Sequence, residues 1–257
     1  MSYSAGVPVD YDVTGSVATI TLNAPERRNA LSASLLADVR NHLDAAEADA
    51  AVRTVVLSHT GTVFCSGMDL TAVTDVPAAD QPIIAFPALL QRIWEYPKPI
   101  IARVDGKARA GGIGLIAAAD IALASPQADF AFTEVRLGIV PAVISVPTLP
   151  RLQYRALLEL CLSGETFGAQ RAAEIGLLNQ ATDRLDEELA RYTAMFSLGE
   201  PKALAATKQL LRRDRSGVSM ADDFAAMSQL SAGYFASAEA AEGIAAFREK
   251  RRPNWAT

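Results

Sequence analysis

A glycine-rich stretch, Ala110–Leu115, follows one apolar segment and opens the next, and it constrains the fold more than any other part of the chain. The run before it, Ile100–Val104, is short, apolar and bounded by turn-forming residues, which predicts a buried strand. Residues 113–119 are also apolar and predict a buried helix. The glycines then lie at a helix N-terminus, where backbone N–H groups lack intrahelical partners. We expect the Gly111 N–H to stabilise negative charge on a ligand oxygen, although glycines that only let a helix pack closely on a strand give the same pattern.

Alternating and helical hydrophobic patterns divide the rest of the chain into strands and helices. Residues 7–13 and 17–22 alternate around a Thr-Gly-Ser turn and predict a β-hairpin. Ser32 is a suitable N-cap for an amphipathic helix that extends to Ala48. Residues 133–141 predict a turn-rich connection, and every segment from Pro147 onward predicts a helix. Further strands are expected at 54–58, 120–124 and 129–132, and helices at 84–96, 151–162, 169–175, 186–196, 201–213, 220–235 and 238–250.

Length and composition allow one large domain or two small ones, and they exclude several classes of partner. Half of the 257 residues are hydrophobic and only 21% are charged, which is enough apolar material for a sizeable core. The net charge is −5 and no basic stripe is present, which argues against a nucleic-acid partner. No apolar run is long enough to span a membrane, so no membrane partner is expected.

The two cysteines, Cys65 and Cys161, have neither the number nor the spacing of a disulfide framework or a metal site. We therefore expect no bound metal and a reducing, cytoplasmic compartment. The first six residues lack the charged and apolar regions of a signal peptide.

Two nucleotide-binding motifs are excluded by their details. Gly106 and Gly111 have the spacing of a phosphate-binding P-loop, but Gly112-Ile113 stands where Lys-Ser/Thr is required. Residues 112–117 fit a loose dinucleotide fingerprint. In that fold the first glycine of the fingerprint comes directly after a strand, but here several residues separate it from the preceding strand.

Several motifs together resemble the crotonase (enoyl-CoA hydratase/isomerase) superfamily, and they cover nearly the whole chain in order. The matching residues are Asn23-x-Pro25 with Asn29-Ala30-Leu31, Phe64–Leu70, Asp105-Gly106 with Ala110-Gly111-Gly112 and Asp120-Ile121-Ala122, Phe130 with Glu134–Pro141, Gly164-Glu165 with Gly176-Leu177, and Phe247–Asn254. The resemblance implies an α/β fold, a crotonase-like spiral of β-β-α units, with an α-helical C-terminal region. It divides the chain into a core at residues 1–195 and a helical trimerisation region at 196–257.

The resemblance implies that the backbone amides of Met68 and Gly111 form an oxyanion hole for an acyl-CoA thioester. It also implies that the loop with Ser66, Met68, Asp69 and Leu70 holds coenzyme A, which is part of the substrate, so no separate cofactor is expected. Arg27 and Arg28 are candidates for the CoA phosphates, or form a solvated basic turn.

Lys250 and its two following arginines are candidates for contact with a CoA bound by a neighbouring subunit, since the family forms trimers and dimers of trimers. A basic helix C-terminus gives the same pattern, because cations are favourable at that end of a helix. The variable segment from Thr71 to Phe86 and the loop from Ile139 to Val146 are expected to line the acyl pocket.

Glu134 matches the second of two glutamates with which hydratases of the family hold a water molecule, and it is the candidate general acid/base. A salt bridge to Arg136 is the alternative role. Gly114 stands where the first glutamate is expected and cannot transfer protons. Glycine at this position is typical of the methylglutaconyl-CoA hydratase-like branch, which favours a branched or carboxylated enoyl-CoA.

The sequence therefore predicts an enoyl-CoA hydratase, a hydro-lyase of fatty acid metabolism. A double-bond isomerase and a non-catalytic acyl-CoA-binding protein are the alternatives.

Overall fold

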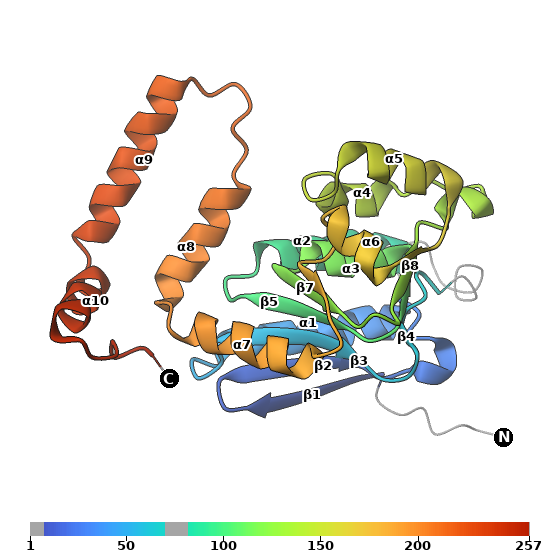
Figure 1. Ribbon diagram of the computed structural model, residues 1–257, viewed down its shortest axis with the longest axis horizontal. Helices are drawn as coiled ribbons and strands as arrows, with labels where there is room; N and C mark the ends of the chain where they lie inside the picture. The colour runs from blue at the N-terminus through green and yellow to red at the C-terminus, as the bar shows by residue number, and fades with distance from the viewer. Residues whose placement is uncertain (1–7, 70–81, 257) are drawn as a thin grey trace.

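The computed structural model describes residues 8–69 and 82–256 and arranges them as two β-sheets with helices packed around them (Figure 1). The larger sheet has the strand order β1-β2-β3-β5-β7-β10. Its β1–β2 pair is antiparallel and its other pairs are parallel. The strands are β1 (Val9–Thr14), β2 (Val17–Leu22), β3 (Thr54–His59), β5 (Ile100–Val104), β7 (Ile121–Ala124) and β10 (Gln180–Ala181).

The smaller sheet has the order β4-β6-β8-β9. Strands β4 (Val63–Cys65), β6 (Lys107–Arg109) and β8 (Asp129–Ala131) run parallel, and β9 (Phe167–Gly168) pairs antiparallel with β8. The chain passes from β3 into β4, from β5 into β6 and from β7 into β8, and a helix follows each pair. This confirms the predicted α/β spiral of β-β-α units.

Helices cover the sheets and supply much of the core. Helix α1 (Ala33–Ala48) begins as predicted, because Ser32 Oγ accepts a hydrogen bond from Leu35 N at 3.2 Å. Every residue of α3 (Gly111–Ala118) is buried, as expected for an apolar helix. The other helices of this part are α2 (Pro82–Glu95), α4 (Ala142–Thr148), α5 (Tyr154–Ser163), α6 (Ala169–Glu174) and α7 (Leu185–Ser197).

Two local predictions were wrong. The segment after Pro141 was expected to be a loop but forms α4, a short helix that includes Pro147. The C-terminal part was expected to be helical throughout, yet β9 and β10 occur between its helices. Strands of two residues carry no hydrophobic period, and they form here only because the exposed edges of β8 and β7 offer hydrogen bonds.

The C-terminal helices differ in how they meet the core. Helix α7 packs on the large sheet through Leu185 and Phe196, so the predicted division between residues 195 and 196 falls inside one helix. Helices α8 (Pro201–Arg212), α9 (Met220–Phe235) and α10 (Ala238–Glu249) lie to one side of the sheets (Figure 1). No described residue of α8 or α9 is buried. The division into a core and a trimerisation region stays a prediction.

Candidate functional site

Three predicted site residues follow the carboxyl ends of three neighbouring parallel strands. Met68 comes after β4, Gly111 after β6 and Glu134 after β8, and these strands are adjacent in the order β4-β6-β8. The last two connections are also joined directly, because Ala110 N donates to Ala131 O at 3.1 Å. Carboxyl ends of parallel strands lie at one edge of a sheet, which is where α/β proteins bind ligands. The fold therefore brings these three distant residues to one edge.

The Met68 amide is free because of the way its loop pairs with the chain around Leu31. Leu31 N donates to Gly67 O at 2.8 Å, and Asp69 N donates to Leu31 O at 3.3 Å. This parallel bridge uses the residues on both sides of Met68, so the N–H of Met68 points away from Leu31. Within residues 8–69 and 82–256 the Met68 N–H has no acceptor.

Gly111 is the first residue of α3, and its N–H likewise has no acceptor in the described part of the chain. The preceding residue, Ala110, adopts φ 47° and ψ −115°. This backbone conformation is that of the first central residue of a type II′ turn, a position that glycine dominates. An L-residue held there stores strain, and such strain is concentrated at functional sites.

The two loops that carry these amides are in direct contact. A Cβ added to Gly67 would lie 3.1 Å from Ala110 Cβ and 3.7 Å from Gly111 N. A Cβ added to Gly112 would lie 2.8 Å from Cys65 O. Glycine is needed at both positions because the loops pack backbone against backbone. The two explanations for the glycines, close packing of backbones and a free N–H at Gly111, are therefore compatible.

Glu134 begins the 3₁₀ helix Glu134–Leu137 and is only 6% exposed. Its Oε2 atom is out of contact with solvent and has no hydrogen-bond partner among the described residues. Burial raises the pKa of the Glu134 carboxyl above its ordinary value. A pKa shifted toward neutrality suits a group that both accepts and donates protons.

The alternative role of Glu134, an ion pair with Arg136, does not occur. Arg136 turns away and donates from Nη2 to Ser163 O at 3.3 Å. The thiol of Cys161 is close enough to feel the carboxylate, and burial together with Glu134 raises the pKa of Cys161 to about 11. Its thiol is therefore neutral at pH 7 and supplies no charge to Glu134.

Gly114 lies on α3 against an apolar wall. A Cβ at this position would be 2.7 Å from Ile144 Cγ2 and 3.4 Å from Leu90 Cδ1. Ile144, which is 3% exposed, comes from α4, the helix that the sequence did not predict. The space that a side chain at position 114 would need is therefore filled by hydrocarbon, and Glu134 has no second carboxylate from this position.

The predicted CoA-binding residues of the first loops lie next to Met68. Ser66 N donates to Arg28 O at 3.1 Å, and Arg27 Nη2 lies 3.6 Å from Asp69 Oδ2. The side chain of Arg27 is 60% exposed, whereas Asp69 is buried. These two loops thus offer an exposed cation beside the candidate oxyanion hole.

The remaining predicted CoA residues have different positions. Leu70 and the segment 71–81 lie outside the described residues. Lys250 directly follows α10, and its N–H donates to Phe247 O at 3.3 Å. Helix α10 lies on the opposite side of the molecule from β4 and β8 (Figure 1). A single chain therefore does not bring Lys250 to this site.

Asn29 is a supporting residue whose role the sequence did not reveal. It is fully buried, its Oδ1 accepts from Ala24 N at 2.8 Å, and its Nδ2 donates to Thr60 O at 3.1 Å and Val63 O at 2.7 Å. Its φ of 50° is a value that asparagine tolerates better than most residues. These bonds fix the loop before Leu31, and through Leu31 the loop of Met68.

The described residues contain no group of three or more His, Cys, Asp or Glu side chains that could hold a metal ion. No helix in the part of the chain that the structure describes is long and apolar enough to cross a membrane.

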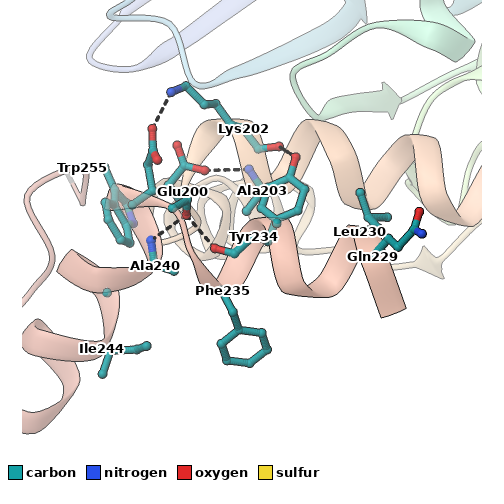
Figure 2. A pocket seen from close by; sticks show the side chains of 14 residues that line it. Glu200, Lys202, Ala203, Gln229, Leu230, Tyr234, Phe235, Ala240, Ile244 and Trp255 are labelled. Atoms are coloured by element: carbon teal, nitrogen blue, oxygen red, sulfur yellow. Dashed lines mark hydrogen bonds and ion pairs between the residues drawn. The ribbon is translucent and has the colours of Figure 1, made fainter. Parts of the chain in front are cut away.

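A separate apolar hollow of about 770 Å³ lies between α8, α9 and α10 and is lined by Leu230, Phe235 and Ile244 among others (Figure 2).

Comparison with known proteins agrees with this geometry. The sequence profile described as "Enoyl-CoA hydratase/isomerase" matches residues 12–257. The 2,3-dehydroadipyl-CoA hydratase of Escherichia coli K12 is 32% identical over 242 residues, which cover 93% of this chain and 94% of that protein.

Two solved structures agree as well. An enoyl-CoA hydratase from Mycobacterium avium is 42% identical, with a TM-score of 0.74 and coverage of 98% of this chain and 100% of that chain. An enoyl-CoA hydratase from Shewanella pealeana is 29% identical, with a TM-score of 0.90 and coverage of 96% of both chains. With the profile match over nearly its whole length, this chain belongs to the enoyl-CoA hydratase/isomerase family, the crotonase superfamily.

Proposed function

We propose that this protein is a hydratase that adds water to a 2-enoyl-CoA, or removes it, with Glu134 as the proton-transferring group. The observation that supports this most directly is the arrangement after β4, β6 and β8. Among residues 8–69 and 82–256, two backbone N–H groups have no acceptor and the buried Glu134 Oε2 has no hydrogen-bond partner, and all three groups follow adjacent parallel strands. Thioester chemistry needs such donors for the developing oxyanion and such a carboxylate for the proton.

In the proposed reaction Glu134 takes a proton from water as the water oxygen forms a bond to the β-carbon of the substrate. The electrons of the carbon–carbon double bond move toward the thioester oxygen, and the amides of Met68 and Gly111 stabilise the resulting enolate. Glu134 then returns the proton to the α-carbon, so no net charge is gained or lost. Loss of one comparable donor in another enzyme costs about 3 kcal/mol of transition-state stabilisation.

Double-bond isomerisation is the second candidate, and one observation favours it. Ile144 fills the space beside Gly114, so Glu134 acts without a second acid there. A single carboxylate is sufficient to move a proton from one carbon of an acyl chain to another. A non-catalytic acyl-CoA-binding protein is the third candidate, and the pKa of Glu134, raised by burial, argues for turnover instead.

We propose a branched or carboxylated acyl group, because the sequence around Glu134 resembles the methylglutaconyl-CoA hydratase-like branch. The name of the Escherichia coli relative, 2,3-dehydroadipyl-CoA hydratase, supports a carboxylated chain. Arg27, Arg28, Ser66 and Asp69 would hold the CoA moiety, together with Leu70. No cofactor beyond the CoA of the substrate takes part in the proposed reaction.

We also propose a trimer or a dimer of trimers, built through the C-terminal helices. The exposed apolar side chains of α9 and α10, such as Phe235 (73% exposed) and Phe247 (84% exposed), would be buried by a neighbouring subunit. Such an assembly would also bring Lys250 of one subunit toward the CoA of another. The free cysteines support a reducing, cytoplasmic compartment.

The test is to replace Glu134 by glutamine and to measure turnover and CoA-ester binding separately. Hydration of a 2-enoyl-CoA removes the absorbance of the conjugated thioester, whereas isomerisation of a 3-enoyl-CoA creates it. We expect Glu134→Gln to reduce turnover at least 1,000-fold, near the upper part of the range for a general acid/base, and to leave CoA-ester binding within a factor of two. Full turnover in this variant would remove Glu134 from the mechanism, and wild-type protein that binds but never turns over would support the binding protein.

A further inference from the structure

His59, the last residue of β3, joins two of the turns through which the chain passes from the large sheet into the small one. The side chain is buried, and its ring packs edge-on against Phe64 of β4, with the ring centres 5.5 Å apart. Its Nε2 atom accepts a hydrogen bond from Asp105 N at 2.9 Å, in the turn between β5 and β6. Its Nδ1 atom lies 3.3 Å from Thr60 O, in the turn between β3 and β4. One imidazole ring therefore connects both turns.

The two partners of the ring require the same neutral tautomer. A backbone N–H such as that of Asp105 can only donate, so Nε2 carries no proton. The proton is then on Nδ1 and is donated to Thr60 O, which can only accept. A charged ring would place an N–H at Nε2 against the N–H of Asp105, and this hydrogen bond would be lost. Burial lowers the pKa of His59 and favours the neutral form, while the nearby charges oppose each other: Asp105 raises the pKa and Arg103 lowers it.

Each of these turns leads through a three-residue strand to one of the candidate oxyanion-hole amides. The first leads through β4 to Met68, and the second leads through β6 to Gly111. Strands β4 and β6 are paired at two positions, with a bulge between them. A slip of one residue would displace one amide relative to the other by about 3.3 Å, whereas an oxyanion needs both donors within about 2.7–3.1 Å. So short a pairing needs contacts outside the strands to fix its register.

The contacts around His59 supply this constraint. A Cβ added to Gly106 would lie 3.0 Å from His59 Cε1 and 2.5 Å from Thr62 O, so the two turns pack with no space for a side chain. Thr60 O, the acceptor for Nδ1, also accepts from Asn29 Nδ2 at 3.1 Å. Asn29 fixes the first of the two loops that carry the amides. The ring is therefore linked to the segments that place both amides.

We propose that His59 is a positioning residue for the proposed reaction: its neutral ring holds the β5–β6 turn to the β3–β4 turn and so sets the register of β4 on β6. This register places the amides of Met68 and Gly111 around one oxyanion. His59 precedes the amino end of β4, whereas both amides follow the carboxyl ends of their strands, so it acts through the strands and not on the substrate. The inference rests on the proposed function, because it needs a reaction that passes through an enolate. It applies equally to hydration and to double-bond isomerisation, since both develop charge on the thioester oxygen.

The test compares His59→Leu, which removes both hydrogen bonds, with His59→Gln, whose amide oxygen replaces Nε2 as an acceptor. The assay is the enoyl-CoA reaction that the wild type catalyses. We expect His59→Leu to lower kcat by about tenfold or more, with KM changed less than about threefold, because a misplacement of about 1 Å can cost on the order of 100-fold in rate. His59→Gln should restore kcat to within about threefold of the wild type.

The control is His42→Leu, because His42 lies on α1 and stacks on Tyr11, with the ring centres 5.0 Å apart. This variant should turn over as the wild type does. A kcat of His59→Leu within twofold of the wild type would overturn the proposal, as would equal losses of kcat in His59→Leu and His59→Gln. Wild-type protein without turnover on any enoyl-CoA would refute the proposed function instead, so the two failures are distinguishable.

A second measurement needs neither a variant at position 59 nor turnover. The chain has two histidines, so protein labelled with ¹⁵N in histidine gives ring signals of His42 and His59 alone, and the His42→Leu variant assigns them. In the nuclear magnetic resonance spectrum at pH 7 we expect Nδ1 of His59 to carry the proton and Nε2 to carry none. A proton on Nε2 would overturn the proposal, because this atom could not then accept from Asp105 N.

Discussion

Replacement of Ala110 by glycine should make this protein more stable, although alanine to glycine is normally a destabilising change. The reason is the backbone of Ala110, at φ 47° and ψ −115°, which an L-residue adopts only under strain. Hydrogen bonds on both sides hold it there: its N–H donates to Ala131 O at 3.1 Å, and its carbonyl accepts from Ile113 N at 2.9 Å. Glycine adopts this conformation without the clash of a Cβ.

The size of the effect follows from three opposing terms. Relief of the strain contributes about 1–3 kcal/mol. The greater freedom of glycine in the unfolded chain costs about 0.4–1 kcal/mol. Loss of a half-buried methyl group costs at most about 0.8 kcal/mol. At the middle of each range these terms give a rise of about 0.5 to 1 kcal/mol in the free energy of unfolding for Ala110→Gly.

The assay is urea unfolding followed by circular dichroism at one fixed protein concentration, because stability in an oligomer depends on concentration. The control is Ala190→Gly, at an exposed position inside α7, which should lower the stability by about 1 kcal/mol. If Ala110→Gly is destabilised as much as the control, Ala110 is not strained and this reasoning is refuted. Because ψ of Ala110 sets the direction of the Gly111 N–H, we also expect kcat to fall a few-fold with KM nearly unchanged.

Three further predictions follow from single contacts. Burial raises the pKa of Glu134, so the folded state binds the carboxyl proton more tightly than the unfolded state does. The free energy of unfolding should therefore fall as pH rises above about 4.5, and Glu134→Gln should flatten this part of the stability–pH curve. Gly114→Glu should cost about 1–3 kcal/mol by crowding Ile144, and a double-mutant cycle with Ile144→Ala should show that the smaller side chain removes at least 1 kcal/mol of that cost; additive effects would contradict the contact. Asn29→Ala should cost about 2–3 kcal/mol in thermal or urea unfolding, because one buried and two partly buried backbone groups lose a partner, and a change below about 1 kcal/mol would contradict that role.

Local patterns in the sequence were enough to predict most elements and the residues of the candidate site. The hairpin at β1 and β2, the helix capped by Ser32 and the buried strands each have a hydrophobic period or a capping residue that acts within a few positions. Gly111 was already indicated by its place at a helix N-terminus, and Met68 and Glu134 were identified by resemblance, which depends on residue types in order along the chain. Such signals are local because propensity, capping and amphipathicity are properties of neighbouring residues.

Only the tertiary structure decided how distant residues meet. It placed Ile144 against Gly114, left Arg136 away from Glu134, and held Ala110 in a conformation that its own side chain disfavours. It also brought Lys208 and Arg212 of α8 to Asp120, which lies in the turn before β7, 88 and 92 positions earlier in the chain. These features depend on packing between segments far apart in the chain, where contacts of the whole fold outweigh the preference of each residue, and no local pattern records such contacts.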